Sequence, residues 1–262
     1  MEQSMYARFL RLGVKSFKLK EQGRCRESLL ELFSWKYPEI KSLDIVKSKD
    51  PNSPYNLANA GFVHEYQFID VGPFNGKGEI TPTPYFYQNL AEAEYCVALY
   101  MYMVLNGVPA KSISILTTYN GQKFLIRDVF HKKCAWNPIF KKPSKITTVD
   151  KFQGQQNDYI ILSLVRTESV GHLRDHRRAC VALSRARLGL YIFGRYDLFK
   201  DCYELRHAFA KLKTKPQELM LVPDETYPTT RKLGEKPKKE IKTIANFSEL
   251  LQLVLEKLKE KS

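Results

Sequence analysis

The chain has 262 residues, 44% of them hydrophobic and 12% aromatic, so it is long enough to bury a sizeable core. Lysine and arginine outnumber aspartate and glutamate by 42 to 28, and the resulting charge of +14 indicates a polyanionic partner such as nucleic acid, with a basic solubilising surface as the plainer alternative. The five cysteines lack paired spacing, which argues against a disulfide-stapled secreted domain, and no segment approaches the ~20 apolar residues of a membrane span.

The first 45 or so residues indicate a leading segment of two helices with a strand between them. Leu29, Leu32 and Phe33 give the second helix an apolar stripe at the i, i+3, i+4 spacing. The elements expected here are a helix over 4–13, a strand over 16–20 and a helix over 26–37.

The middle of the chain alternates strand and helix patterns. Proline, asparagine and glycine mark residues 47–61 and 72–84 as loops, and Gly107 is placed to cap the helix before it. The predicted strands are 64–71, 112–120, 145–150, 158–167 and 188–194, and the predicted helices are 87–107, 121–134 and 177–186. The last of these helices is apolar nearly all round, which predicts that it is buried.

This alternation predicts an α/β fold with a mostly parallel sheet and helices on both faces. We assign it to residues 1–200. The pattern weakens over 201–262, which we interpret as a basic C-terminal extension. It contains an exposed linker at 223–244 and an amphipathic helix at 247–261 that could serve as a docking element.

One half of an ATP site is missing from the sequence. No G-x-x-x-x-G-K-[ST] loop occurs, and no strand ends on the acidic residue of a Walker B motif. The glycine-rich stretch from Gly72 to Gly78 misses the spacing and has glycine in place of the hydroxyl residue that would hold magnesium, so we interpret it as a loop. The chain therefore lacks the groups that grip the β-phosphate and the metal.

Four other stretches contain the residue types that phosphate chemistry and nucleic-acid contacts need: glycines where the backbone must come close, arginines, glutamines and hydroxyl residues. They are LKEQGR at 19–24, ISILTTYNGQ at 113–122, TVDKFQGQQNDYIILSLVRT at 148–167 and VALSRAR at 181–187.

In this order the four stretches resemble motif IV, the strand-and-turn that follows it, motif V and motif VI of superfamily 1 helicases. Within that superfamily they resemble the branch typified by the nonsense-mediated-decay helicase. Finer wording such as QGRCRESL, PYFYQNLAEAEY, VGHLRDHRR and YPTTRK is similar to the intron-binding spliceosomal helicases. This resemblance covers almost the whole chain.

The resemblance implies a RecA-like second motor domain of a P-loop NTPase, at residues 1–200, with motif IV in the leading segment. It implies that Met1 is an internal methionine of a longer protein, whose N-terminal motor domain holds the Mg²⁺ of a shared ATP. The implied activity is that of an ATP-dependent RNA helicase in pre-mRNA splicing, inactive as this chain alone. Intron RNA and spliceosomal proteins are the implied partners, the nucleus the location, and no membrane is involved.

The resemblance also assigns residues to the nucleotide. Arg185 matches the arginine finger of motif VI, and Arg24 matches the motif IV arginine that reaches the γ-phosphate. A guanidinium can pair bidentately with phosphate oxygens, and an arginine finger can be worth ~10³–10⁵ in rate. Gln22, Gly154 and Gln156 fall at neighbouring positions of the cofactor site.

A second group of matches concerns nucleic acid. Gln153, with Gly154, matches the turn of motif V that couples the nucleotide state to the grip on nucleic acid. Thr117, Tyr119, Gln122 and Thr148 match positions that face its backbone, where hydroxyls and amides suit sequence-independent contacts. Turn residues such as Tyr119 and Gln122 could equally serve only as structural caps.

Two departures leave alternatives open. Gly23 stands where many relatives have tyrosine, and Gln156 stands where many have glutamate. These departures motivate a second hypothesis, a scaffold module that binds RNA or spliceosomal proteins without hydrolysis. A third is a helicase of cytoplasmic mRNA decay, or one that acts on DNA.

The remaining candidates favour structural roles. His172 and His176 have metal-like spacing, but arginines surround them, so we expect no metal site. We interpret Asp150 as a residue that ties its turn to neighbouring backbone N–H groups. The aromatic residues are expected to pack in the core or on helix faces rather than to stack on bases: Tyr85, Phe86, Tyr87, Tyr95 and Tyr100.

Overall fold

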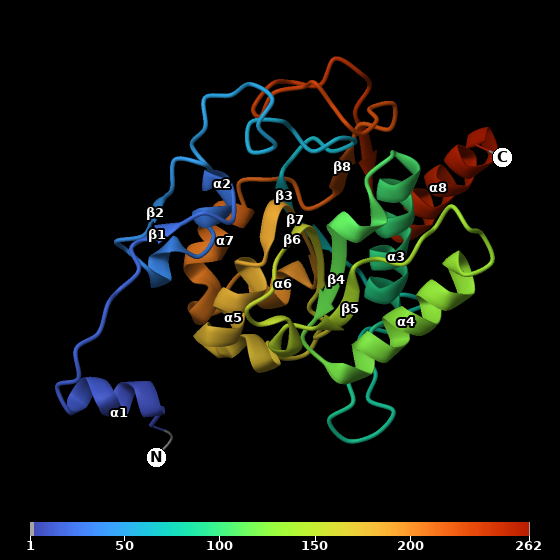
Figure 1. Cartoon of the computed structure of the whole chain (residues 1–262). Coiled ribbons are helices and arrows are strands. Elements are labelled where there is room, and N and C mark those ends of the chain that lie inside the picture. The colour runs from blue at the N-terminus through green and yellow to red at the C-terminus, as the bar shows by residue number, and fades with distance from the viewer. Residues whose placement is uncertain (1–2, 262) are drawn as a thin grey trace.

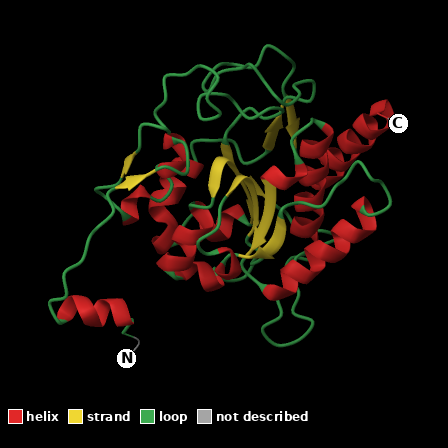
Figure 2. Ribbon diagram, in the orientation of Figure 1, coloured by secondary structure: helices red, strands yellow, loops and turns green. Residues whose placement is uncertain are grey.

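The computed structural model describes residues 3–261 and has a central sheet between two layers of helices (Figures 1 and 2). The central strands are β3 (Tyr66–Asp70), β4 (Ile113–Thr117), β5 (Lys145–Thr148), β6 (Asn157–Ser163) and β7 (Ala186–Gly194). All five are parallel, in the order β3-β7-β6-β4-β5. The predicted α/β fold with a mostly parallel sheet is confirmed.

The other elements are shorter strands and the surrounding helices. The helices are α1 (Met5–Arg11), α2 (Glu27–Leu30), α3 (Leu90–Leu105), α4 (Asn120–Cys134), α5 (His176–Leu183), α6 (Tyr196–Phe199), α7 (Arg206–Leu212) and α8 (Phe247–Lys261). The short strands are β1 (Glu21–Gln22) with β2 (Lys41–Ser42), and β8 (Leu219–Leu221) with β9 (Lys242–Ile244). Single 3₁₀ turns lie at Ser34–Lys36, Ala110–Ser112, Asp150–Phe152, Gly171–Arg174 and Tyr203–Leu205.

Alternation along the strands separates two hydrophobic layers. In β6, Ile161 packs in the layer that contains α3, α4 and α8. Its neighbours Ile160 and Leu162 pack in the opposite layer, with α2, α5 and α7. Successive side chains of a strand point to opposite faces, so a strand buried on both sides is apolar throughout. The expectation of helices on both faces is therefore correct.

The C-terminal helix α8 packs against α3 in the first of these layers. Its buried residues recur at helical spacing, namely Leu250, Leu253, Val254 and Leu258. The apolar face of α8 is thus packed within the chain, and a role of this helix as a docking element stays a prediction. Ile244 of β9 and Leu219 of β8 join the same layer, so two strands lie in the region interpreted as an extension. The division at residue 200 stays a prediction.

The leading segment differs most from expectation. Helix α1 forms as predicted, but residues 16–20 form no strand, and the helix predicted over 26–37 shortens to α2 and a 3₁₀ turn. Every residue from 3 to 20 is exposed, and α1 stands apart from the body of the molecule (Figure 1). Its apolar side chains, including Phe9 and Phe17, contribute nothing to either core layer.

Helix α5 also corrects the sequence reading, since it is amphipathic and not buried all round. Ala179, Cys180, Ala182 and Leu183 are buried, whereas His176 and Arg177 are exposed. The long helix α3 ends as predicted, with Gly107 at φ 94° just beyond its cap. No helix in residues 3–261 combines the length and the apolar character needed to cross a membrane.

Candidate nucleotide and nucleic-acid site

The predicted site residues divide between the two ends of the parallel sheet. Gln156 and Arg185 immediately precede β6 and β7 and so lie at the amino end. Thr117 and Thr148 are the last residues of β4 and β5, at the carboxyl end. Strand β6 spans seven residues, which separates the two ends by roughly 20 Å.

At the amino end, Gln22 shapes the turn that presents Arg24. Its side-chain oxygen accepts hydrogen bonds from the backbone N–H of Arg24 at 2.8 Å and of Cys25 at 2.9 Å. Its amide donates to the Cys25 carbonyl and to the Ser42 hydroxyl of β2. Arg24 is therefore held by a turn whose backbone N–H groups are hydrogen-bonded by the Gln22 side chain.

Arg24 and Arg185 meet at this turn although 161 positions separate them in the chain. The Arg24 guanidinium donates to Gln156 Oε1 at 2.8 Å and to the Ser184 carbonyl at 3.0 Å. Arg185, only 8% exposed, donates to the carbonyls of Val181 and Gln155 and to the Ser184 hydroxyl. The structure thus brings together Arg24, Gln156 and Arg185, three of the five residues predicted to bind the cofactor, with Gln22 supporting them.

No carboxylate neutralises this pair among residues 3–261. Burial, and then the adjacent Arg24 cation, lowers the pKa of Arg185. Arg187, two residues further on, instead pairs with Asp158 and bonds the Tyr55 hydroxyl. Two adjacent cations without an acid form a site that an anionic group would complete. Unlike Arg24 and Arg185, Arg187 thus has a carboxylate partner of its own.

The segment from Thr148 to Gln156 connects the two ends of the sheet. It leaves β5, makes a 3₁₀ turn with Phe152 buried beneath it, and enters β6. Gln153 and Gly154 are exposed, and Gly154 adopts φ 79° with open space around it. Glycine is favoured there because a side chain disfavours the left-handed region.

At the carboxyl end, most of the predicted nucleic-acid residues are buried. Thr117 and Gln122 are fully buried, and Thr148 and Tyr119 are 6% and 4% exposed. The Gln122 amide is occupied on both sides: it accepts from the Asn89 N–H and donates to the Asn89 carbonyl and the Ser163 hydroxyl. These contacts match the structural alternative for Gln122 and leave Gln153 as the predicted contact residue with a free surface.

Asp150 ties its turn through its backbone carbonyl, which accepts a hydrogen bond from the Gln153 N–H at 3.4 Å, and not through its carboxylate as expected. Its carboxylate pairs with Arg178 of α5 at 3.1 Å. An ion pair between exposed side chains contributes little to stability, so the turn depends on buried Phe152 and on its own backbone hydrogen bonds.

Comparison with known proteins shows the family to which the chain belongs. A family model described as an AAA domain matches residues 1–197. The chain belongs to the AAA domain family. It is 54% identical over 254 residues to RNA helicase aquarius of Mus musculus, covering 97% of this chain and 17% of that protein. It is 32% identical over 260 residues to pre-mRNA-splicing factor cwf11 of Schizosaccharomyces pombe, covering 98% of this chain and 20% of that protein.

A more distant relative is the regulator of nonsense transcripts 1 homolog of Arabidopsis thaliana, 30% identical over 202 residues, with 74% of this chain and 16% of that protein covered. The chain spans about a fifth or less of the length of these relatives. The similarity confirms the resemblance to the aquarius branch that the finer motifs indicated.

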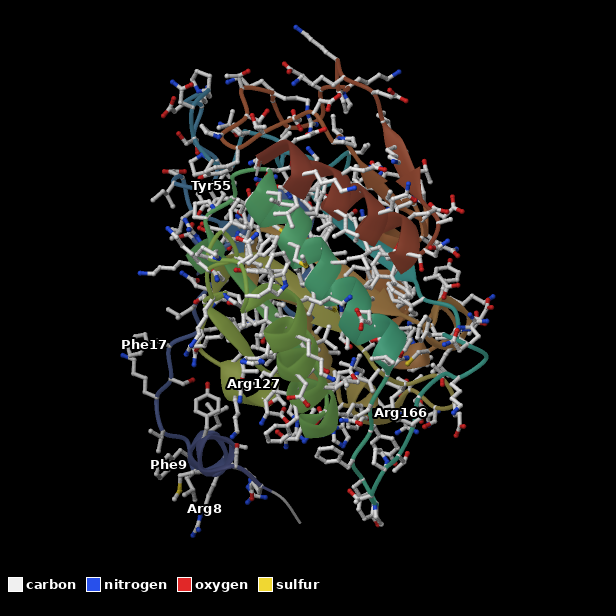
Figure 3. All side chains as sticks on the ribbon, turned by 90° about the vertical axis from the view of Figure 1, so that its right-hand side faces the viewer. Arg8, Phe9, Phe17, Tyr55, Arg127 and Arg166 are labelled. Atoms are coloured by element: carbon white, nitrogen blue, oxygen red, sulfur yellow. The ribbon has the colours of Figure 1, made fainter. Side chains whose placement is uncertain are left out.

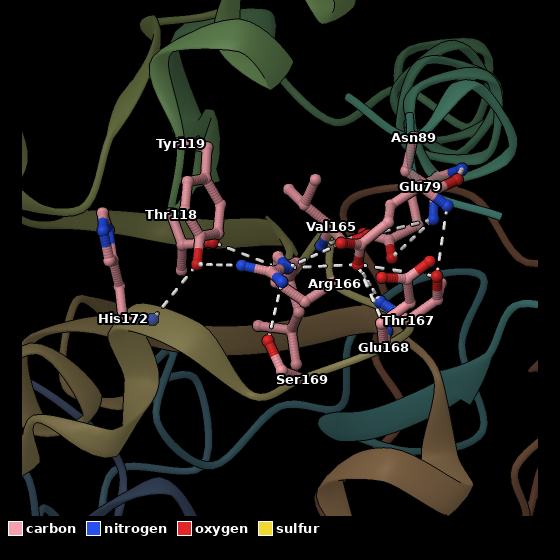
Figure 4. Close-up of polar contacts among 12 residues, drawn as sticks. Glu79, Asn89, Thr118, Tyr119, Val165, Arg166, Thr167, Glu168, Ser169 and His172 are labelled. Atoms are coloured by element: carbon pink, nitrogen blue, oxygen red, sulfur yellow. Dashed lines mark hydrogen bonds and ion pairs between the residues drawn. The ribbon is translucent and has the colours of Figure 1, made fainter. Parts of the chain in front are cut away.

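In this AAA domain, sequence reasoning missed a buried ion pair beside Tyr119 (Figure 4). Glu79, from the loop interpreted only as a connector, pairs with Arg166 at 2.9 Å, and both side chains are almost buried. The Arg166 guanidinium lies 4.0 Å from the centre of the Tyr87 ring and also contacts Tyr119. The Tyr119 ring stacks on His172 with centroids 4.5 Å apart. No local pattern marks a pair 87 positions apart.

The second missed residue is Glu92, which is fully buried at the start of α3. Its carboxylate accepts hydrogen bonds from the Ser163 hydroxyl at 2.6 Å and from the backbone N–H of Val165 at 2.8 Å. Burial raises the pKa of Glu92 to about 8. The signal in the sequence was N-x-x-E at 89–92, the pattern of a helix cap, since Asn89 does cap α3.

Glu92 also hydrogen-bonds a backbone segment, at Val165, that has an unusual conformation. Val165 has φ 75°, a conformation in which a β-branched residue is a genuine outlier. Its N–H points at the Glu92 carboxylate, so the buried acid supports the turn that follows β6. In residues 3–261 no group of three histidine, cysteine or acidic side chains is placed to hold a metal ion.

Proposed function

We propose that this chain is the second motor half of an ATP-dependent RNA helicase that acts in pre-mRNA splicing in the nucleus. The observation that carries the proposal is the pair Arg24 and Arg185, which are adjacent at the amino end of the sheet and have no carboxylate partner among residues 3–261. The names of the two relatives that cover nearly the whole chain, an RNA helicase and a splicing factor, support the reaction class and the process.

The residues present fit one side of a bound nucleotide. Arg24 and Arg185 offer planar donors for phosphate oxygens, and Gln156 beside them can orient the Arg24 guanidinium. Bound ATP would supply the transferable γ-phosphoryl group, with its Mg²⁺ held by ligands outside this chain. The two cations would stabilise charge that develops on that group, which is the main catalytic contribution in phosphoryl transfer.

The RNA would lie along the segment that runs from the carboxyl end of β5 to the amino end of β6. Thr117, Thr148 and Gln122 would act there mainly by fixing the loops, because their side chains are buried. Gln153 and Gly154 would touch the RNA backbone directly, since both are exposed. Residues 149–156 join these loops to Gln156 at the arginines, and this continuous segment would couple the nucleotide state to the grip on RNA.

The splicing branch is favoured over cytoplasmic mRNA decay by similarity. Identity is 54% to the aquarius relative across nearly all of the chain, against 30% to the nonsense-transcript regulator across three quarters of it. Intron RNA, spliceosomal proteins and a first motor domain are the partners that we infer for the complete protein.

The decisive measurement is RNA-stimulated ATP hydrolysis by a protein that joins this chain to the first motor domain. We expect Arg185→Ala to lower kcat by ~10³-fold or more, because an arginine finger is removed. Arg206→Ala, an exposed arginine on α7, is the matched control and should leave kcat unchanged.

This chain alone should show no turnover, because phosphoryl transfer depends on groups positioned from both sides. Robust hydrolysis by the Arg185→Ala protein would refute the assignment. If the unmutated two-domain protein binds RNA but hydrolyses nothing, the scaffold hypothesis takes its place.

A further inference from the structure

A basic groove of about 830 Å³ runs along the outer edge of the sheet, and neither Arg24 nor Arg185 lines it. Its walls are α4, the edge strand β5 and the segment of residues 135–144 between them. The cations that line it are Arg127, Lys141, Lys142 and Lys145, with His131 beside them. None of the lining residues is acidic. The groove therefore suits an anionic chain.

The walls of the groove are fixed by buried contacts. Phe140 is 4% exposed and packs in the layer of α3, and the Tyr100 hydroxyl of α3 donates to the Lys141 carbonyl. The Ser144 N–H donates to the Ile113 carbonyl at 2.9 Å. Because the backbone is anchored, the lysine side chains project from a preformed surface and need little ordering of the main chain when a ligand binds.

Arg127 links the groove to the sheet. It donates to the Ile146 carbonyl of β5 at 2.9 Å and is exposed on the outward side of α4 (Figure 3). Phe124 and His131 lie three residues before it and four after it, so the three side chains form one exposed stripe along α4. The stripe leads from the carboxyl end of the sheet into the groove.

Exposed aromatic rings stand at both ends of this path. Trp136, whose chain neighbours Ala135 and Asn137 line the groove, is 64% exposed. At the other end Phe124 is 47% exposed and stacks on Phe86, with ring centroids 6.2 Å apart. The neighbouring Tyr85 is 87% exposed, which corrects the expectation that this residue packs in the core or on a helix face. Bases stack on such rings regardless of sequence.

We propose that this basic groove binds single-stranded RNA and extends the path that begins at the exposed residues Gln153 and Gly154. Lysines and Arg127 would contact phosphates, while Trp136 and Phe124 would stack on bases. An acidic peptide would satisfy the same charges but would make no use of exposed rings at both ends. The groove is also continuous with residues 148–156, the segment proposed to contact RNA. Thr147 lines the groove, and the Lys145 side chain donates to the Gln155 side chain. The inference rests on the proposed RNA-binding function.

The first test measures binding of a fluorescein-labelled oligouridine of ~16 nucleotides across a salt series, using the complete 262-residue chain. We expect Lys141→Gln/Lys142→Gln to weaken binding about tenfold and to reduce the slope of log K against log salt by about 1.4. Lys236→Gln/Lys238→Gln removes the same charge from the exposed segment after β8 and is the matched control. Equal losses in both variants would show diffuse attraction and overturn the groove.

The second test uses the fluorescence of Trp136. Trp35 is the one other tryptophan of the sequence and stacks on His207 in the opposite layer. Oligouridine should quench the wild-type emission, and Trp136→Phe should abolish the quenching while preserving the fold. Unchanged quenching in that variant, or stronger competition by an acidic peptide than by RNA, would refute the proposal.

The two proposals fail separately. Arg185→Ala changes hydrolysis and leaves the groove intact, so loss of the helicase assignment with retained Lys141 and Lys142 effects would leave an RNA-binding groove. If Arg185→Ala loses hydrolysis as expected but the lysine variants bind RNA as well as the wild type, the groove proposal fails and the helicase proposal stands.

Discussion

A buried arginine lies near each end of the sheet, and the two arginines have opposite electrostatic surroundings. At the carboxyl end, Arg166 is almost buried and has Glu79 as its partner and two aromatic rings around it. At the amino end, Arg185 is equally buried but has only carbonyls, a hydroxyl and a second cation, Arg24. Among residues 3–261, Arg166 has a carboxylate partner and Arg185 has none.

This difference distinguishes support from function. A buried charge that has its own partner is a finished structural element, and removing the partner exposes the cost of burying it. A buried charge without a partner is tolerated at sites where an external group completes it. From this difference we expect three effects on the stability of the fold, given below from the largest to the smallest. They add to the tests of hydrolysis and RNA binding.

The largest effect should come from breaking the finished pair. We expect Glu79→Gln to lower the free energy of unfolding by about 3 kcal/mol, because Arg166 is then buried without its counter-charge. Urea denaturation gives the value. Glu168→Gln makes the same charge change at a nearby exposed position and should cost under ~0.5 kcal/mol. If both variants lose a similarly small free energy of unfolding, the Glu79–Arg166 pair does not stabilise the carboxyl end of the sheet.

The next effect concerns Glu92 and pH. Its raised pKa means that the folded protein keeps a proton that the unfolded chain releases, so this contribution to stability is full below pH ~4.5 and is lost as pH rises through about 8. Relative to the wild type, Glu92→Gln should gain about 2 kcal/mol between pH 6 and pH 8.

Denaturation curves at several pH values measure this difference. Glu168→Gln makes the same charge change at an exposed position outside α3 and is the control, so its curve should run parallel to that of the wild type. Parallel curves for Glu92→Gln as well would show that Glu92 is already ionised in the folded protein.

The smallest effect should be at the unfinished site. Arg24→Gln should change the free energy of unfolding by under ~1 kcal/mol, because two lost hydrogen bonds are offset by relief from the Arg185 cation. Inorganic triphosphate should raise the Tm of the wild type more than that of the variant, as a bound anion stabilises the folded state. A destabilisation as large as that of Glu79→Gln would make the amino end structural too.

The contrast also marks how far the sequence alone could lead. Apolar runs predicted β4, β6, β7 and α3 within a few residues, and motif matches predicted that Arg24 and Arg185 act together. The pattern could not show that the Gln122 amide is consumed by Asn89, because exposed and buried glutamines look alike in a turn. It also gave no hint of Glu79 beside Arg166, since long-range ion pairs depend on the fold and leave no periodic trace.

The exposed leading segment has a practical consequence for anyone who handles this protein. Residues 3–20 carry several lysines and arginines and lie wholly in solvent, so trypsin should cut there long before it reaches the core. Cleavage after Arg11 or Lys15 would remove α1 and leave the Gln22 turn in place. The trimmed product would lose the exposed ring of Phe9 and still present both arginines, which makes it a convenient starting point for crystallisation with phosphate analogues.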